Sequence, residues 1–143
     1  MIPIHEAQNQ CDLTVYIAGK WEARERLQAI AQELRVHGYR VTSSWLDHPL
    51  TQGYLVDNGV DEGVKDLDEI DASNVFVLDT LDEGATGGRE VELGYALAEG
   101  SNRLLIIVGP SRNIFHSMVA IQFGSWDDVL PVFFSPELLE ERR

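Results

Sequence analysis

A glycine-rich turn followed by an acidic residue is the first place in the sequence where chemistry is expected. Gly87 and Gly88 follow an apolar run that ends at Asp79, and they precede a predicted helix that carries Glu92. A strand, a glycine turn and a helix in this order leave free backbone N–H groups at the helix start, where an anion or polar ligand binds. An ionised carboxylate there suits a nucleophile at a sugar carbon. Glu92 is therefore the candidate nucleophile, and the alternative is a surface acid that pairs with Arg89 or solvent.

A second group of acids lies on the preceding predicted helix, at about 57–72. Asp68 and Glu69 are interpreted as part of a solvated helix face. One acid of this helix, turned toward the strand ends, is a candidate acid/base partner for Glu92, and the pattern alone does not select which one. The spacing of Val60 and Val64 predicts that they belong to the buried face of the same helix.

Two further groups of residues have open interpretations. Tyr16 alternates with apolar neighbours in a predicted strand, which indicates a core tyrosine with a hydrogen-bonded hydroxyl, and a role beside the nucleophile is the alternative. Thr86, Gly87 and Gly88 are candidates for holding a phosphate or a 5′-hydroxyl. Their pattern is neither the Gly-x-Gly-x-x-Gly dinucleotide loop nor the Gly-Lys-Ser/Thr loop of nucleotide triphosphatases.

Other reaction classes find little support in the sequence. The histidines lack metal-ligand spacing, so neither a metal site nor a cofactor is expected; they are His5, His37, His48 and His116. No Gly-x-Ser-x-Gly elbow surrounds any serine, which disfavours a serine hydrolase. Cys11 is the single cysteine, which excludes an intrachain disulfide and suits a reducing cytoplasm.

Bulk properties restrict the class of protein. The 143 residues with 44% hydrophobic content predict one domain over 1–143, with 1–11 as a loosely ordered lead-in. A net charge of -13 disfavours binding to nucleic-acid polymers, although one small phosphate remains compatible with it. No apolar run approaches the length of about 20 residues that spans a bilayer, and the first residues do not resemble a signal peptide, so a cytoplasmic protein is expected.

The positioning elements alternate along the chain. Strands are predicted at 13–18, 39–45, 74–79, 103–108 and 118–123; helices are predicted after the first strand, at about 57–72, after Gly88, and at 126–139 with a bend or break at Pro131. This alternation predicts a single-domain, doubly wound, flavodoxin-like parallel sheet with helices on both faces. Ligands of such sheets bind beyond the carboxyl ends of the strands, at the switch in strand order.

Four segments of the chain resemble the nucleoside 2-deoxyribosyltransferase family, which includes the 2′-deoxynucleoside 5′-monophosphate N-hydrolases. They are Val-Tyr-Ile-Ala-Gly at 15–19, Asp-Leu-Asp-Glu-Ile at 66–70, Asn-Val-Phe-Val-Leu at 74–78 and Gly-Arg-Glu-Val-Glu-Leu-Gly-Tyr-Ala at 88–96, the last being the most specific. The resemblance implies that Glu92 is the nucleophile that forms a covalent deoxyribosyl-enzyme. It also implies that Asp66 protonates the departing base and that Tyr16 orients Glu92.

The resemblance extends to substrate contacts. Gly19 matches the turn after the first strand, and Trp21 is a candidate for stacking on the base or for the core. Thr86 stands where the family's nucleoside transferases carry a carboxylate and its monophosphate hydrolases carry a hydroxyl, which favours nucleotides, because a hydroxyl can donate to a phosphate. Ser117 is similar to a residue that reaches a neighbouring subunit's site, which implies a homodimer or a larger homo-oligomer.

The expected activity is therefore cleavage of the N-glycosidic bond of a nucleoside or its 5′-monophosphate. Whether water or a second base resolves the intermediate stays open. A non-catalytic nucleotide-binding module of the same fold is the alternative. A flavin-binding protein is a weaker one, because residues 19–22 lack the hydroxyl-rich run that would wrap a flavin phosphate.

Overall fold

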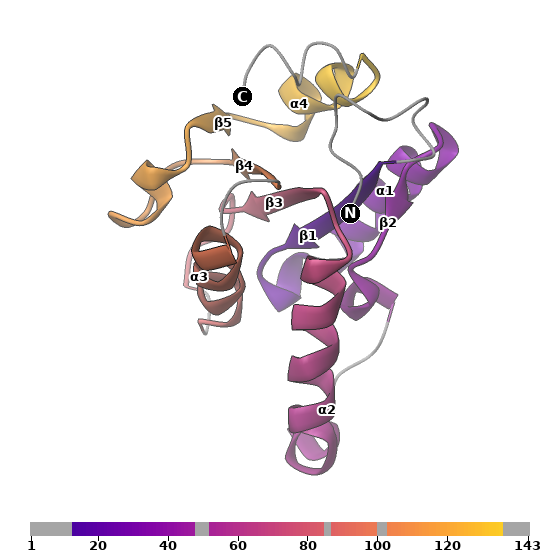
Figure 1. Cartoon of the computed structure of the whole chain (residues 1–143), viewed down its shortest axis with the longest axis vertical. Coiled ribbons are helices and arrows are strands. Elements are labelled where there is room, and N and C mark those ends of the chain that lie inside the picture. The colour runs from indigo at the N-terminus through magenta and orange to yellow at the C-terminus, as the bar shows by residue number, and fades with distance from the viewer. Residues whose placement is uncertain (1–12, 48–51, 85–86, 100–102, 136–143) are drawn as a thin grey trace.

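Five parallel strands form the centre of the molecule, as the sequence predicted (Figure 1). The computed structural model describes residues 13–47, 52–84, 87–99 and 103–135. The strands follow the order β2-β1-β3-β4-β5 across the sheet. Their bounds are β1 (Thr14–Ala18), β2 (Arg40–Val41), β3 (Val75–Asp79), β4 (Leu104–Val108) and β5 (Ile121–Phe123). The order reverses between β1 and β3, so the carboxyl ends of these two strands border the switch point where ligands bind in this fold.

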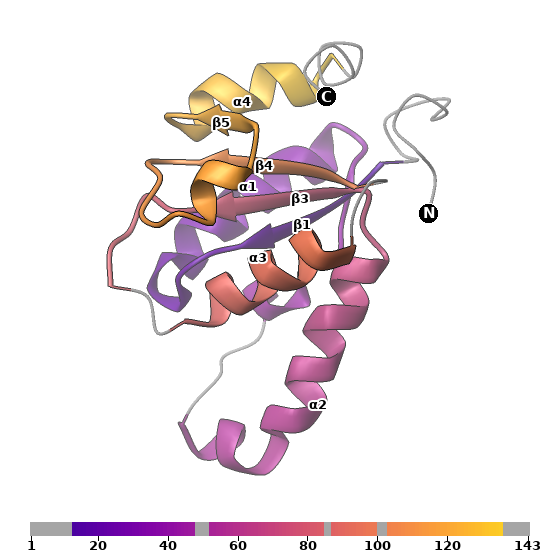
Figure 2. The same ribbon diagram turned by 60° about the vertical axis from the view of Figure 1, so that its left-hand side comes forward.

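Helices cover both faces of the sheet (Figures 1 and 2). Helices α2 (Gln52–Asp71) and α3 (Gly88–Glu99) contact each other on one face, and α1 (Arg24–Val36) contacts α4 (Trp126–Phe133) on the other. Three short 3₁₀ helices lie in connections, at η3 (Trp21–Ala23), η4 (Ser44–Asp47) and η5 (His116–Met118). The fold is therefore the flavodoxin-like α/β arrangement expected from the alternation of elements.

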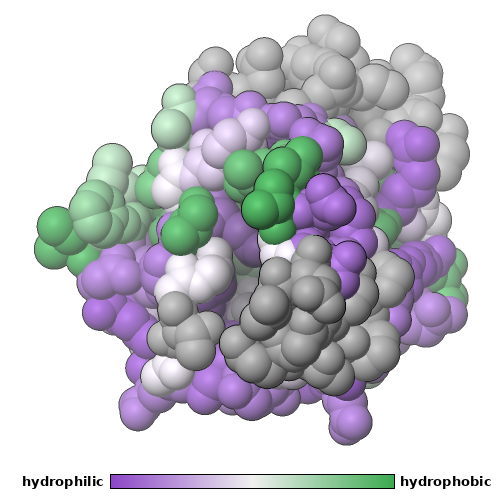
Figure 3. Space-filling model, turned by 90° about the horizontal axis from the view of Figure 1, so that it is seen from below, coloured by the Kyte–Doolittle hydropathy of each residue, from purple (hydrophilic) through white to green (hydrophobic). Residues whose placement is uncertain are grey.

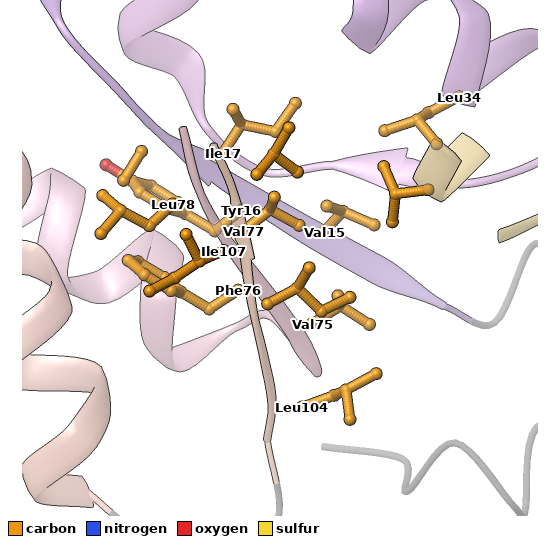
Figure 4. Packing of buried hydrophobic residues seen from close by; sticks show 14 of the residues in the cluster. Val15, Tyr16, Ile17, Leu34, Val75, Phe76, Val77, Leu78, Leu104 and Ile107 are labelled. Carbon is orange, nitrogen blue, oxygen red and sulfur yellow. The ribbon is translucent and has the colours of Figure 1, made fainter. Parts of the chain in front are cut away.

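The core lies where helices pack on β1 and β3. Every residue of these two strands is buried, which explains why their sequences are apolar without alternation. Figure 4 shows Tyr16 and Phe76 among the aliphatic side chains of β1, β3 and β4. Because both faces of the sheet are covered, the polar ends of the strands are the part of the sheet left for a ligand.

Asp79 holds the carboxyl end of β3 in place. Its buried carboxylate accepts hydrogen bonds from the Trp126 indole at 2.7 Å, from Arg26 at 2.8 Å and from the Leu81 backbone N–H at 3.0 Å. These bonds connect α1, α4 and the loop that follows β3. The loop therefore leaves the sheet in a fixed direction toward the glycine turn.

Several element predictions differ from the structure. The second strand covers only Arg40–Val41, because Ser44 already begins η4. The fifth strand, predicted at 118–123, covers only Ile121–Phe123, because η5 ends at Met118. Helix α2 begins at Gln52, five residues before its predicted start. Val60 and Val64 are 82% and 54% exposed, so their assignment to the buried face is wrong. The physical reason is that the amino-terminal half of α2 projects beyond the sheet (Figure 2), and only its carboxyl-terminal half reaches the core, through Ile70.

The last helix contains its proline without ending there. Helix α4 begins after Ser125, whose side chain accepts from the Asp128 N–H as a predicted N-cap, and it continues through the exposed Pro131 to Phe133. Residues 136–139 of the predicted helix, and the lead-in at 1–11, lie outside the described residues. Among the helices that the structure describes, none combines the length and apolar character needed to cross a bilayer.

Candidate active site

The structure brings Tyr16, Asp66 and Glu92 together from three different elements. Tyr16 is the third residue of β1 and is fully buried, with its ring stacked on Phe76 at a centroid distance of 5.8 Å. Its hydroxyl is buried and has no hydrogen-bond partner among the described residues. The expected core position is therefore confirmed, whereas the expected partner for the hydroxyl is not among the described residues. The hydroxyl instead lies within the electrostatic reach of Glu92 and Asp66.

Glu92 lies in the second turn of α3, which the glycine turn begins. Gly87 has a φ of +108°, which glycine tolerates, and its carbonyl accepts the first helical hydrogen bonds from Glu90 and Val91. Burial and, after it, the charge of Asp66 raise the pKa of the Glu92 carboxyl to about 8. The nearby Tyr16 hydroxyl lowers this pKa, although its geometry is not that of a formed hydrogen bond.

Asp66 faces the same site from α2. Its Oδ1 atom is buried and lacks a hydrogen-bond partner in the described part of the chain. Burial raises the pKa of Asp66 to about 6, and the charges of Glu69 and Glu62 contribute to the same direction. The charge of Asp66 raises the pKa of Glu92, so the two carboxyls are treated as an interacting pair.

Glu69 belongs to this group, which corrects its interpretation as part of a solvated face. Its Oε1 accepts a hydrogen bond from the Ser44 backbone N–H at 3.2 Å, and its charge raises the pKa values of Tyr16, Asp66 and Glu92. The i to i+3 spacing from Asp66 is the sequence signal that would have placed both on one side of the helix. Asp68 is exposed, as expected.

Helices α2 and α3 are held together beside these carboxylates. The Tyr95 hydroxyl on α3 lies 3.0 Å from both carboxylate oxygens of Asp71 on α2. Asp66 lies five positions before Asp71, and Glu92 three positions before Tyr95. This contact therefore fixes the separation of the helices that carry the two candidate catalytic carboxylates.

The turn after β1 packs closely against α1 at Gly19 and carries the cation of Lys20. A Cβ on Gly19 would lie 2.7 Å from Cδ1 of Leu27, so glycine is needed for close packing against α1. The Lys20 ammonium, which sequence analysis did not single out, donates to the Glu83 carbonyl oxygen at 2.8 Å. Lys20 therefore lies beside the loop that leads to the glycine turn.

Trp21 occupies the same end of the sheet but is packed by protein. Its ring lies 6.2 Å from that of Trp45, and the Arg24 guanidinium lies 4.4 Å from its centroid. Trp45 is buried, and its indole N–H donates to the Ile17 carbonyl oxygen at 2.8 Å. Trp45 therefore belongs to the core, and the half-buried Trp21 packs against that core with Trp45 and Arg24 as neighbours of its ring.

The remaining predicted site residues are spread over the loops. Gly87 and Gly88 stand at the start of α3, and Thr86 lies outside the described residues. Ser117 is exposed in η5, next to His116, whose Nε2 lies 2.9 Å from Glu90 of α3. Arg89 is buried; it lies 3.6 Å from Glu90 and donates to the Asp79 carbonyl oxygen, so its described ion pair is with Glu90 rather than with Glu92.

The chemistry of the site is that of carboxylates and hydroxyls. Within the ranges that the structure describes, no group of three or more His, Cys, Asp or Glu side chains is arranged to hold a metal ion. The arrangement places two carboxyls beside a buried hydroxyl, and two carboxyls are what a covalent displacement at a sugar carbon requires, one as nucleophile and one as acid.

Comparison with known proteins yields a structural match and no sequence match. No protein-family model matches the chain, and no curated protein sequence matches it. Among solved structures, the CMP N-glycosidase BcmB of Clostridium botulinum matches with 16% sequence identity and a TM-score of 0.49. The match covers 90% of this chain and 97% of the other.

Proposed function

We propose that the chain cleaves the N-glycosidic bond of a nucleoside or nucleotide through a covalent glycosyl intermediate on Glu92. The observation that carries the proposal is the position of Glu92 beside Asp66 and Tyr16, since Asp66 Oδ1 and the Tyr16 hydroxyl are buried and have no hydrogen-bond partner among the residues that the structure describes. Buried polar atoms are almost always hydrogen-bonded in proteins, so both atoms are expected to gain a partner when substrate binds: the departing base for Asp66, and the ionised Glu92 carboxylate for the Tyr16 hydroxyl. The resemblance of residues 88–96 to the nucleoside 2-deoxyribosyltransferase signature supports the same assignment.

In the first half of the reaction, the ionised Glu92 carboxylate attacks the anomeric carbon. The C–N bond breaks as the new C–O bond forms, and the departing base takes a proton from Asp66. The pKa of Asp66 is raised by its burial, which helps this carboxyl to hold a proton near neutral pH. The Tyr16 hydroxyl stays neutral, because burial and the two carboxylates raise its pKa, and it donates to Glu92.

In the second half, water or a second base attacks the same carbon. The C–O bond to Glu92 breaks and regenerates its carboxylate, and Asp66 accepts the proton that the attacking group releases. Either acceptor restores both carboxyls to their starting states. Hydrolysis and transfer therefore use the same protein groups, and the proposal covers both reactions.

We also propose that a 5′-phosphate binds at the end of the site formed by Lys20 and the glycine turn before α3. Lys20 provides a cation whose described partner at this loop is a backbone carbonyl, and the start of α3 provides backbone N–H groups. A helix start favours an anion through its dipole and its free N–H groups. Thr86, immediately before Gly87, would add a hydroxyl donor. The substrate would thus lie with its phosphate at the loop and its anomeric carbon at Glu92.

A homo-oligomer is the quaternary structure that we propose with this function. Val91 and Phe115 are exposed apolar residues at a hollow of about 320 Å³ between α3 and the segment before η5. Ser117 lies in η5, two residues beyond Phe115. A second copy seated here would cover the hollow.

The direct test follows base release by chromatography. The wild-type protein, Glu92→Gln and Asp66→Asn are incubated with 2′-deoxynucleosides, ribonucleosides and their 5′-monophosphates, with and without a second free base. We expect no turnover by Glu92→Gln, and a loss of roughly 10²- to 10⁴-fold by Asp66→Asn. Mass spectrometry of quenched wild-type protein should detect the glycosyl adduct on Glu92. Full activity in Glu92→Gln would remove the proposed nucleophile.

The thermal stability of Glu92→Gln provides the folding control. The pKa of Glu92 is raised from 4.5 to about 8 in the fold, so a buried charge destabilises the wild type increasingly as pH rises through this window. Glutamine carries no charge, so the variant should melt at a higher temperature than the wild type at pH 8.5. The difference should vanish below pH 4.5. A variant that melts lower at every pH would be structurally damaged, and its inactivity would not count.

A further inference from the structure

Ser44 presents a buried hydroxyl that the proposed mechanism does not use. Within the described part of the chain, its Oγ atom has no hydrogen-bond partner, and the same holds for the nearby Tyr16 hydroxyl and Asp66 Oδ1. The mechanism assigns the latter two to catalysis. A buried hydroxyl without a partner is uncommon in folded proteins, so Ser44 needs a separate explanation.

The backbone around Ser44 is fixed by its neighbours. The Ser44 N–H donates to the Thr42 carbonyl oxygen at 2.9 Å and to Glu69 Oε1 at 3.2 Å. The flanking residues are bonded to β1: Ser43 Oγ accepts from the Ile17 N–H at 3.1 Å, and the Trp45 indole donates to the Ile17 carbonyl. In this turn, the Ser43 and Trp45 side chains hydrogen-bond to the backbone of β1, whereas the Ser44 hydroxyl forms no hydrogen bond with any described residue.

Its surroundings restrict what it can bind. The Ser44 N–H donates to Glu69, which lies three residues after Asp66 on α2, and the neighbouring Ser43 and Trp45 are bonded to Ile17, which follows Tyr16 in β1. Ser44 therefore lies at the end of the site that holds the Glu69, Asp66 and Glu92 carboxyls, and not at the Lys20 end. An anionic group would be repelled by these three carboxyls. A neutral group with a hydrogen-bond donor or acceptor suits a serine hydroxyl, which provides both.

We propose that Ser44 determines substrate specificity by hydrogen-bonding a neutral polar group beside the scissile bond, and that Glu69 positions it. The inference rests on the proposed function for the identity of that bond. Two parts of a nucleoside carry such a group next to the anomeric carbon: the 2′-hydroxyl of a ribose and the polar edge of the base. The hydrogen-bonding chemistry is the same for both, and matched substrates separate them.

The test measures discrimination between substrates that differ by one group. One pair consists of ribo and 2′-deoxy nucleotides with the same base, and the other consists of bases with and without a carbonyl or amino group at the edge. Ser44→Ala should lower kcat/KM roughly 10- to 100-fold for the member that carries the group and leave its partner unchanged. The pair whose ratio collapses identifies the group that Ser44 contacts.

Two further substitutions separate recognition from folding. Ser43→Ala removes the hydroxyl bonded to Ile17, so it should lower the melting temperature while preserving both ratios. Glu69→Gln keeps an oxygen that accepts from the Ser44 N–H and should retain the ratio that Ser44→Ala abolishes. Glu69→Ala should lose it. Loss in both Glu69 variants would overturn the positioning role.

The result also distinguishes failure of this inference from failure of the proposed function. If the wild type is active and Ser44→Ala preserves both ratios, the Ser44 inference is wrong and the glycosidase stands. If the wild type cleaves no substrate, the same ligand pairs are titrated calorimetrically into wild type and Ser44→Ala. Discrimination that depends on Ser44 would then uphold the recognition site without the reaction, and equal affinities in both proteins would overturn it.

Discussion

At the residue scale, the two candidate catalytic carboxyls have pKa values in an unexpected order. The nucleophile must be ionised and the acid protonated, yet the raised pKa is about 8 for Glu92 and about 6 for Asp66. In the free protein near neutral pH, the pair therefore holds one proton, predominantly on Glu92. Catalysis needs the less populated arrangement, with that proton on Asp66. A hydrogen bond from Tyr16 to Glu92 favours this arrangement, because the bond stabilises the ionised Glu92 carboxylate.

This order leads to a prediction about pH. Below about 6 both carboxyls are protonated and Glu92 cannot attack; above about 8 both are ionised and no proton reaches the base. The profile of kcat/KM should be bell-shaped, with limbs near these two values that belong to the pair. Because the charge of Glu69 raises both pKa values, Glu69→Gln should move both limbs to lower pH. Stopped-time assays across pH 4.5–9.5 measure this, and a flat profile across that range would contradict it.

At the element scale, a glycine in helix α2 and a glycine packed against the loop after β3 differ in whether a side chain would fit. Gly63 lies in α2, where an added Cβ would meet nothing within 4 Å. Gly109 follows β4 with a φ of +122°, and its Cβ would lie 2.5 Å from Thr80 Oγ1 and 2.9 Å from the Leu81 nitrogen. The first glycine weakens a helix, whereas the second permits the close approach that holds the loop.

Alanine substitutions at these two positions should therefore have opposite signs. We expect Gly63→Ala to stabilise the fold by about 0.5–1 kcal/mol, because alanine favours the helix and restricts the unfolded chain. Gly109→Ala should destabilise it by roughly 2–4 kcal/mol through backbone strain and the clash. Urea denaturation of both variants measures the difference. Equal midpoints would show that the loop adjusts without cost.

The sequence predicted elements better where packing is local than where it is long-range. Strands β3 and β4 were predicted from apolar runs and β1 from its β-rich, alternating residues, and the alternation of strands with helices predicted that the sheet is parallel. The i to i+3 spacing places Glu69 on the same side of α2 as Asp66, but which side of the helix faces inward depends on how η4 meets α2, and the sequence does not show that. The outward position of Val60 and Val64 has the same origin, since helical spacing does not reveal that α2 extends past the sheet.

The candidate site shows a similar division. The residues of the Glu92 segment follow from a strand, a glycine turn and a helix, which are local features. Selection of Asp66 from its acidic helix came from the family resemblance, because four acids within six residues provide no period that distinguishes one of them. Lys20 and Ser44 were missed because their significance is a contact with residues 63 and 25 positions away.

At the scale of the whole molecule, charge is the dominant property. The net charge of -13 gives the protein a negative field that repels an anionic substrate before binding. From the side to which α2 projects, the surface is mainly hydrophilic, with apolar side chains in small separate groups (Figure 3). Cations such as Lys20 and Arg112 are concentrated near the loop after β3, where Arg112 donates to the Thr80 carbonyl oxygen at 2.7 Å.

Salt should therefore affect charged and neutral substrates differently. Raising the ionic strength from about 0.01 M to 0.15 M shortens the screening length from about 30 Å to about 8 Å. For a 5′-monophosphate, kcat/KM should rise over this range, by at most about tenfold. For the corresponding nucleoside it should stay constant. A fall for the monophosphate would indicate that the local cations near Lys20 outweigh the net charge of the protein.

The distribution of the site over the fold has an evolutionary consequence. Tyr16, Asp66 and Glu92 lie on a strand and two helices packed in the domain, whereas the proposed phosphate end lies on connections that tolerate changes in length and sequence. Mutations in those connections would alter which nucleotide enters without moving the reacting groups. Descendants of one ancestral chain would then diverge in substrate while inheriting the same covalent chemistry, and their loops would be the segments in which that history is recorded.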